Sequence, residues 1–256
     1  MNAPKAQGRL FLVPTPLDFG CAEQAPVSDV LPVCTLAIAA SLQHWVCENA
    51  KSTRAFLKRV GESHPLIAPL AEQQITELPR HVHKKGDHQS GFDGKPLLAA
   101  ALKGHDIGLI SEAGMPAVAD PGSSVVRAAH DLGLTVIPLV GPVSLLLALA
   151  ASGLNGQNFA FVGYLPQDAG ERSARLKQLE SLAHKTGQTQ LWIETPYRNA
   201  AMLSGLLQSL QGGTRLAIAS GLTLPSARIQ SHTMAQWKKG LQGPDGHTPA
   251  VYAIGP

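Results

Sequence analysis

Two loops built mainly from small residues are the part of this chain best suited to hold a ligand. The first is residues 111–116 (SEAGMP) and the second is residues 140–144 (VGPVS). Each follows a short apolar run and precedes a helical pattern, which is the strand, loop and helix repeat of a parallel sheet. Ligands of such sheets bind beyond the carboxyl ends of the strands, and small residues let a ligand approach the backbone. The pattern predicts a pocket for a small cofactor, and tight turns without a ligand are the alternative.

Three carboxylates stand at comparable positions. Glu112 directly follows a buried strand, so a role near the substrate competes with a solvated loop position. Asp120 precedes a Pro-Gly pair, which is typical of a helix N-cap and first turn. Glu194 opens a similar strand-to-helix segment in the second half of the chain, where it would either cap the helix or pair with Arg198.

The sequence lacks the motifs of several other chemistries. The first strand is followed by no G-x-G-x-x-G, which argues against NAD or FAD, and no P-loop, G-x-S-x-G or H-E-x-x-H pattern occurs. His81, His83 and His88 fall in a polar, Gly-rich segment without cysteines or a clear carboxylate pattern. We therefore expect a solvent-exposed, candidate mobile loop there and no metal site.

The elements that position these loops follow from apolar periodicity and turn residues. Residues 1–8 are expected to form a disordered tail, and a domain boundary is placed near Leu165, giving domains 9–164 and 165–256. Residues 72–78 could be helical. Strands are predicted at residues 9–13, 44–47, 66–70, 107–110, 134–138, 157–166, 191–194, 215–220, 229–232 and 251–254. Helices are predicted at residues 33–42, 49–60, 96–103, 123–132, 143–151, 171–186, 199–210 and 234–241.

The amino-acid composition excludes few functional classes of protein. The formal net charge of +3 is mild, and the basic groups at residues 51–59 and 238–239 are expected to be solvated helix faces. Three widely spaced cysteines without a C-x-x-C motif favour a reducing cytoplasm. The N-terminus has no apolar signal region, and the most apolar segment, residues 143–151, is shorter than the about 20 residues that span a bilayer.

At this point the sequence resembles a known family. Residues 111–122 (SEAGMPAVADPG) resemble the S-D-A-G-T-P-x-x-S-D-P-G signature of the tetrapyrrole (corrin/porphyrin) methylase superfamily. Residues 136–154 (VIPLVGPVSLLLALAASGL) are similar to a segment of its branch of ribosomal RNA small subunit methyltransferase I, V-P-I-P-G-P-S-A-x-x-x-A-L-S-A-S-G-L. Residues 159–172 are similar to F-L-F-x-G-F-L-P followed by G-E-R, and residues 194–198 to E-S-P-H-R. The resemblance covers nearly the whole chain in order.

The resemblance implies an α/β fold of two α/β domains, an N-terminal parallel-sheet domain and a C-terminal mixed-sheet domain, with the cofactor cleft between them. It also implies a homodimer and S-adenosylmethionine as methyl donor. This cofactor has no phosphates, so the missing phosphate fingerprint is compatible with it, and small-residue loops offer it close backbone approach. The residues that the resemblance assigns to the cofactor are Pro16, Leu17, Ala113, Gly114, Met115, Ala117, Val143, Ser144, Leu145, Tyr164, Leu165, Thr195, Pro249 and Ala250.

The chain departs from the family mainly in segments that face the substrate. The family has G-N-L where this chain has residues 18–20 (DFG), and its H-E-H-N is absent near residues 69–73. Its A-R-E-L-T-K corresponds to residues 219–224 (ASGLTL), which lack the acid and the lysine, whereas Glu48 is kept. The donor side therefore matches better than the acceptor side, which favours a methyltransferase and leaves the acceptor open.

Three functions remain in competition. The first is methylation of RNA, at a ribose 2′-hydroxyl of small-subunit ribosomal RNA, by in-line methyl transfer. The second is the same chemistry on a tetrapyrrole or another small molecule, and the third is a non-catalytic S-adenosylmethionine-binding module. An in-line displacement depends chiefly on alignment. A hydroxyl acceptor must also lose its proton, and Glu112 and Glu48 are the candidate bases.

Overall fold

The computed structural model describes residues 6–18, 20–80, 82, 87 and 91–256. The chain divides into two compact units, unit 1 (Met1–Phe19 and Ala25–Val143) and unit 2 (Gly20–Gln24 and Ser144–Pro256). Of the expected disordered tail, residues 1–5 lie outside the described part. Gly8 is buried, and its amide donates to the Ala101 carbonyl at 2.8 Å, so ordered structure begins before the first strand.

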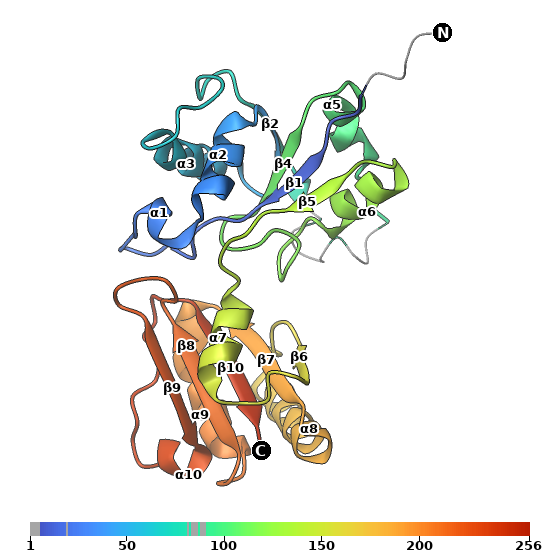
Figure 1. Cartoon of the computed structure of the whole chain (residues 1–256). Coiled ribbons are helices and arrows are strands. Elements are labelled where there is room, and N and C mark those ends of the chain that lie inside the picture. The colour runs from blue at the N-terminus through green and yellow to red at the C-terminus, as the bar shows by residue number, and fades with distance from the viewer. Residues whose placement is uncertain (1–5, 19, 81, 83–86, 88–90) are drawn as a thin grey trace. The chain divides into compact units, whose positions relative to one another are not determined.

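Unit 1 is built on a five-stranded parallel sheet with the strand order β3-β2-β4-β1-β5 (Figure 1). The three central strands end at the same level, because Val13 of β1 and Cys47 of β2 both pair with Ile110 of β4. The residues that follow these strands are therefore neighbours. The strands are β1 (Leu10–Val13), β2 (His44–Cys47), β3 (Gln74–Glu77), β4 (Ile107–Ile110) and β5 (Val136–Pro138).

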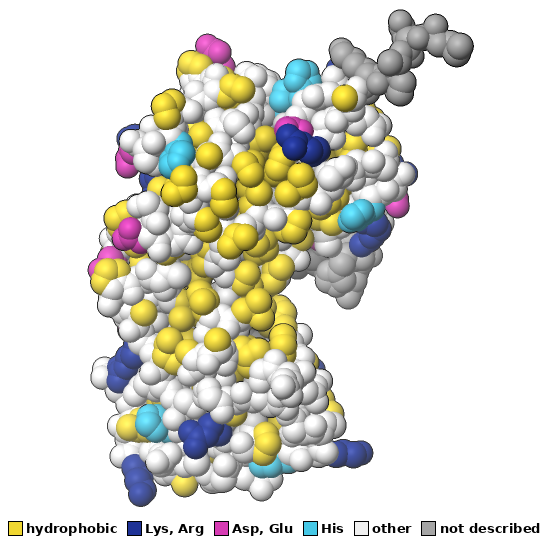
Figure 2. All heavy atoms as spheres, viewed as in Figure 1, with side chains coloured by type: hydrophobic (Ala, Val, Ile, Leu, Met, Phe, Trp, Pro, Cys, Tyr) yellow, Lys and Arg dark blue, Asp and Glu magenta, His cyan; other side chains and the backbone are white. Residues whose placement is uncertain are grey.

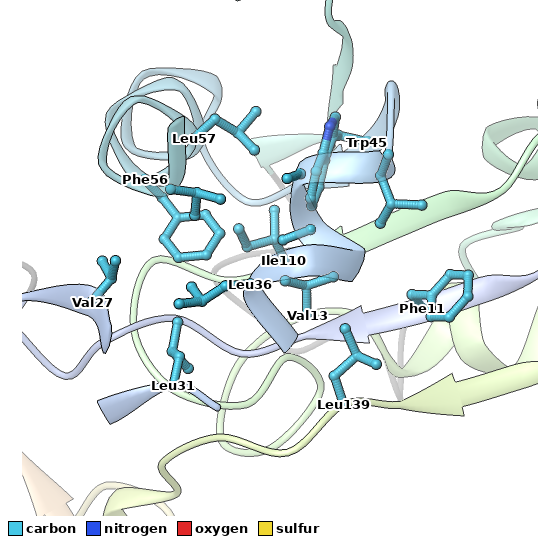
Figure 3. Packing of buried hydrophobic residues seen from close by; sticks show 14 of the residues in the cluster. Phe11, Val13, Val27, Leu31, Leu36, Trp45, Phe56, Leu57, Ile110 and Leu139 are labelled. Atoms are coloured by element: carbon cyan, nitrogen blue, oxygen red, sulfur yellow. The ribbon is translucent and has the colours of Figure 1, made fainter. Parts of the chain in front are cut away.

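Helices cover both faces of this sheet, because successive side chains of a strand point to opposite faces. Phe11 and Val13 of β1 belong to the core under α1 to α3, whereas Leu10 belongs to the core under α5 and α6. Figure 3 shows the first core, where Leu36, Phe56 and other helix side chains meet the sheet. The helices are α1 (Val27–Val30), α2 (Val33–Ser41), α3 (Ala50–Gly61), η1 (Lys95–Leu98), α5 (Ala99–Leu102) and α6 (Ser123–Asp131).

Gly108 of β4 has no side chain, and this leaves room for Trp45, the largest residue of this core. A Cβ atom on Gly108 would lie 2.5 Å from two ring atoms of Trp45, which pairs with it across the sheet. The Trp45 indole in turn donates to Gln73 at 2.9 Å, and the Gln73 amide donates to the Ala68 carbonyl at 3.0 Å. Trp45 therefore anchors the loop that leads into β3.

That loop corrects two sequence-based expectations. The strand expected at residues 66–70 is wrong, because this segment forms turns and bends, and residues 72–78 are not helical. The third strand is instead β3, whose side chains are mostly exposed at the edge of the sheet. An edge strand needs no continuous apolar run, so apolar patterning pointed to the wrong residues.

Unit 2 contains a mixed five-stranded sheet with the order β6-β7-β10-β8-β9. Only β6 and β7 are parallel, and the other neighbours are antiparallel. The strands are β6 (Phe159–Phe161), β7 (Thr189–Glu194), β8 (Arg215–Ser220), β9 (Arg228–Thr233) and β10 (Ala250–Gly255). The helices are α7 (Ser144–Ser152), α8 (Ala169–Thr186), η2 (Pro196–Arg198), α9 (Asn199–Ser209) and α10 (Met234–Trp237).

The core of unit 2 lies between the sheet and the helices α8 and α9. Trp192 of β7 and Tyr252 of β10 stack with ring centroids 5.6 Å apart, and both are fully buried beside Leu176 and Leu206. The α7 helix packs against β8, β9 and β10, so both faces of this sheet are covered. Residues 20–24 also belong to this unit, where Ser226 donates to Glu23 at 2.7 Å.

The expected α/β class is confirmed, with a parallel sheet in unit 1 and a mixed sheet in unit 2. The division of the chain differs from the boundary placed near Leu165, since α7 and β6 belong to unit 2. The reason is pairing: β6 adds to the sheet of unit 2 beside β7, and α7 covers that sheet. In the described part of the chain, no helix combines the length and apolarity needed to cross a membrane.

Candidate active site

Three loops meet at the carboxyl edge of the parallel sheet in unit 1. Thr15, after β1, and Gly114, after β4, form an isolated bridge with two backbone hydrogen bonds of 2.9 and 3.1 Å. The third loop follows β5, where Gly141 lies so near the first loop that a Cβ atom on it would be 2.3 Å from Pro14. The predicted neighbourhood of small-residue loops is present, with the loop after β1 joined to it.

Glycine is required at the centre of this arrangement. Gly114 has a φ of +74°, and a Cβ atom on it would lie 3.1 Å from Leu17 and 3.5 Å from the Pro142 carbonyl oxygen. A side chain there would fill the space next to the predicted cofactor residues Leu17 and Met115. The absence of a side chain at the buried Gly114 keeps this space open.

The structure brings together three carboxylates at this edge. Glu48 follows β2, Glu112 follows β4 one residue after Ser111, and Asp120 lies in the loop before α6. The Glu48 amide donates to the Ile110 carbonyl at 3.4 Å, which fixes the end of β2 against the end of β4. Burial and the negative charges of Glu48 and Glu112 together raise the pKa of Asp120 to about 7, although a hydrogen bond with Ser111 acts in the opposite direction. Part of the Asp120 population is therefore protonated at neutral pH.

Asp120 does not cap the following helix, which corrects the simplest interpretation of the sequence. The N-cap position of α6 is Gly122, and the capping carboxylate is Asp87. Asp87 accepts from the amides of Gly122 and Ser124 at 2.8 and 2.7 Å and from the hydroxyls of Ser123 and Ser124 at 2.7 Å each. These hydrogen bonds lower the Asp87 pKa although burial opposes them. Asp120 is consequently available for another role.

The backbone on both sides of Val118 is unusual. Ala117 and Ala119 have φ values of +64° and +66°, a region that alanine rarely adopts. Such residues persist only where the surroundings hold them, and they are frequent at functional sites. Ala117 is one of the predicted cofactor residues, so the strained segment coincides with the predicted site.

The loop after β1 is fixed to α3 at a position where the chain departs from its apparent relatives. Asp18 is 4% exposed, and both of its carboxylate oxygens accept from Arg59, at 3.1 and 2.8 Å. Arg59 also donates to the Ala25 carbonyl at 2.6 Å. One member of the basic group at residues 51–59 is thus a structural ion pair and not a solvated charge.

In unit 2, four predicted cofactor residues lie at one edge of the mixed sheet. Tyr164, Leu165 and Thr195 line a hollow of about 500 Å³, together with Pro166, Gln167, Tyr197 and Arg198. Ala250 pairs with Glu194, the residue before Thr195. Tyr164 and Tyr197 are 56% and 76% exposed, which is unusual for aromatic side chains. Exposed rings next to a hollow suit the binding of a planar group.

Buried charges hold the lining of this hollow in place. Glu194 and Arg198 form an ion pair at 3.0 Å, and Glu194 also accepts from the Thr195 amide at 2.9 Å. Arg198 donates to the Leu165 carbonyl at 3.2 Å, and Arg172 of α8 donates to the Gln167 carbonyl at 2.8 Å. The predicted pairing of Glu194 with Arg198 is confirmed. The part played by Arg172 was missed, because an arginine inside a charged helix is no signal by itself.

The remaining predicted residues divide between the two units. Pro16 and Ala113 flank the Thr15–Gly114 bridge, and Val143 ends unit 1. In unit 2, Ser144 and Leu145 begin α7, and Pro249 precedes β10. Their roles in cofactor binding stay predictions. His81, His83 and His88 lie outside the described residues, and the described part of the chain holds no group of three or more metal-ligating side chains.

Taken separately, each unit presents residues that fit one part of a sulfonium cofactor, which carries a free amino acid part and an adenine. In unit 1, the carboxylates of Glu48, Glu112 and Asp120 near the small-residue loops favour a positively charged ligand. The hollow with Tyr164 and Tyr197 suits a planar base. No phosphate cradle is needed for such a molecule.

A model of the family described as Tetrapyrrole (Corrin/Porphyrin) Methylases matches residues 46–237. The chain belongs to this family. Its members use S-adenosylmethionine as methyl donor, so this protein is an S-adenosylmethionine-dependent methyltransferase. The predicted family, enzyme class and cofactor are confirmed.

Two relatives support the same class. A protein of Mesorhizobium japonicum named ribosomal RNA small subunit methyltransferase I is 31% identical over 225 residues, which cover 88% of this chain and 67% of the relative. A Vibrio cholerae protein of the same name is 33% identical over 236 residues, which cover 92% of this chain and 72% of the relative.

Among solved structures, the methyltransferase CobJ resembles this chain with a TM-score of 0.53 and 18% identity. The match covers 97% of this chain and 94% of CobJ. At this identity the likeness concerns the fold alone. The tetrapyrrole methylase fold therefore extends over both units.

Proposed function

We propose that this family member methylates a ribose 2′-hydroxyl of small-subunit ribosomal RNA in the cytoplasm. The observation that carries the proposal is the similarity to two relatives named ribosomal RNA small subunit methyltransferase I over about nine-tenths of the chain. Unit 2 also carries an excess of basic residues, which suits a polyanionic substrate. A homodimer is part of the proposal.

The cofactor residues are proposed from both units. In unit 1 they belong to the loops joined by the Thr15–Gly114 bridge and to the end of β5. In unit 2 they surround the hollow at Tyr164 and the start of β10. The proposed set is Pro16, Leu17, Ala113, Gly114, Met115, Ala117, Val143, Ser144, Leu145, Tyr164, Leu165, Thr195, Pro249 and Ala250.

When bound, S-adenosylmethionine supplies an electrophilic methyl group. The protein has to hold the acceptor hydroxyl in line with that group, and alignment accounts for much of the rate. Glu112 and Glu48 lie at the ends of adjacent strands, where either carboxylate can accept the hydroxyl proton. Asp120 lies beside them, and its pKa, raised to about 7, leaves it partly protonated at neutral pH.

Glu112→Gln is expected to lower the turnover number by about a hundredfold, because the amide keeps the shape but accepts no proton. The affinity for S-adenosylmethionine is expected to stay within about twofold, since Glu112 is not among the residues proposed to bind the cofactor. Single-turnover methyl transfer and calorimetric titration measure the two quantities.

Glu48→Gln is the companion variant, and Glu62→Gln is the control, since Glu62 is exposed at the end of α3. Unchanged turnover in Glu112→Gln would remove Glu112 from the mechanism. A loss confined to Glu48→Gln would assign the proton transfer to Glu48.

A small-molecule acceptor is the second candidate function. It is favoured by the segments at residues 18–20, 69–73 and 219–224, which depart from the ribosomal RNA branch. Asp18 shows that one such departure has a structural role here, because it pairs with Arg59. A module that binds the cofactor without catalysis is the third candidate.

Calorimetry with S-adenosylmethionine and with its demethylated product tests cofactor binding first. Transfer of a radiolabelled methyl group to total cellular RNA, compared with a small-molecule extract, then separates the three candidates. Label in small-subunit ribosomal RNA is the expected result. Label only in the extract would support the second candidate, and binding without transfer to either would support the third.

A further inference from the structure

The net charge of this chain resides in one unit. In unit 1 the Lys and Arg residues equal the Asp and Glu residues in number, so the formal charge of +3 belongs to unit 2. In the lower part of Figure 2, where β8, β9 and α10 lie, basic and histidine side chains are visible and acidic ones are not. Of the basic residues of unit 2, Arg172 and Arg198 hold the lining of the hollow at Tyr164, and the proposed cofactor and catalytic residues include none.

Part of the charge lies along the C-terminal half of α8. Lys177, Ser181 and Lys185 are spaced four residues apart, so they lie on one side of the helix. All three are exposed, and neither lysine makes an ion pair with a described residue. They line an open depression of about 700 Å³, whose other lining residues are Glu180, His184, Ser209 and Gln211.

A second element adds cations at the edge of this depression. Lys238 directly follows α10, and its ammonium donates to the Leu210 carbonyl at 3.2 Å, next to Gln211. The Ala235 amide donates to the Gly212 carbonyl at 2.9 Å, which fixes α10 to the same turn. Lys239 is exposed beside Lys238. The pair at residues 238–239, expected to be a solvated helix face, is therefore part of a larger basic surface.

The one acidic residue of the depression is turned into the protein. Glu180 is 3% exposed, and its carboxylate accepts from the Gln211 amide at 2.8 Å and from the Thr214 hydroxyl at 2.5 Å. His184 also contacts the Thr214 hydroxyl, at 2.9 Å. Glu180 thus holds the turn at residues 211–214 in place and leaves the outer surface to the cations.

We propose that this surface, named the basic end and made of Lys177, Ser181, His184, Lys185, Lys238 and Lys239, binds the phosphate backbone of the RNA substrate. Flexible ammonium groups with the Ser181 hydroxyl between them suit phosphates, which are bound without reading the base sequence. The inference rests on the proposed function. It adds an anchoring surface distinct from the residues proposed for cofactor and catalysis.

The test is a salt titration of the affinity for purified small-subunit ribosomal RNA by filter binding. For Lys177→Ala/Lys185→Ala, the slope of log affinity against log salt is expected to fall by about 1.4, since each phosphate contact on single-stranded RNA adds about 0.7. Affinity near physiological salt is expected to fall about tenfold. Lys177→Arg/Lys185→Arg keeps the charge and is expected to restore both values. The affinity for S-adenosylmethionine is expected to stay unchanged in all variants.

Lys95→Ala/Lys103→Ala is the matched control, because both lysines are exposed in unit 1 and the change in charge is the same. If the wild-type protein methylates RNA but Lys177→Ala/Lys185→Ala keeps its slope and affinity, the basic end does not bind RNA and the inference is overturned. An equal loss in the control pair would also overturn it, since the effect would then come from net charge alone. If the wild-type protein neither binds nor methylates RNA, the proposed function itself fails.

Discussion

Asp120→Asn is expected to stabilise unit 1 by about 2–4 kcal/mol at pH 8 and by almost nothing at pH 4. Burial and the charges of Glu48 and Glu112 raise the Asp120 pKa to about 7 from 3.8. A carboxyl with a raised pKa favours the folded state while it is protonated, so its contribution is present below about pH 4 and is lost as the pH rises to 7. Each unit of pKa shift corresponds to about 1.4 kcal/mol of stability. The expected gain of about 2–4 kcal/mol lies below the value for the full shift, because Asp120 is partly exposed to solvent.

Hydrogen exchange of the β4 amides, measured from pH 4 to 8, reports the stability of unit 1 separately from that of unit 2. Asp131→Asn is the control, since Asp131 is exposed at the end of α6, and its effect is expected to stay below about 1 kcal/mol. A difference between Asp120→Asn and wild type that does not grow with pH would show that Asp120 ionises freely. The rate of methyl transfer by Asp120→Asn would show whether the Asp120 carboxylate takes part in the reaction. Carboxylates with a raised pKa that reduce stability are common at active sites.

Gly108→Ala is expected to destabilise unit 1 by about 3 kcal/mol. The new Cβ atom would lie 2.5 Å from the ring of Trp45, which is buried in the centre of the sheet and held by its hydrogen bond to Gln73. Because the ring cannot move without breaking that bond and its packing, the strain falls on β2 and β4. Urea unfolding followed by tryptophan fluorescence, with hydrogen exchange of unit 1, measures the loss.

The matched control is Gly91→Ala, because a Cβ atom on Gly91 would meet no heavy atom of the described part of the chain within 4 Å. Its effect is expected to lie within about 0.5 kcal/mol. The explanation fails if Gly108→Ala is as stable as this control. A double substitution that also replaces Trp45 with a smaller apolar residue is expected to lose less than the sum of its parts, because the removed ring frees the space.

The sequence alone was sufficient for the strands and loops on which the proposed donor site is built. The strands β1, β2, β4 and β8 begin and end within a residue of the predicted positions, because buried strands are continuous apolar runs that turn residues interrupt. The loops around Gly114 and Gly141 were predicted for the same reason. Both are local features, since a strand end and the loop after it lie within a few residues of each other.

Only the tertiary structure decided which side chains act together. Asp87 caps α6 from a segment 35 residues earlier, Arg59 pairs with Asp18 across 41 residues, and Lys238 lies beside the depression lined by α8. No periodicity encodes such partners, because chain folding brings them together through contacts between elements far apart in sequence. The same reason explains Asp120, whose neighbouring carboxylates come from the ends of other strands. The residue types were visible in the sequence, but their charges and partners depend on the fold.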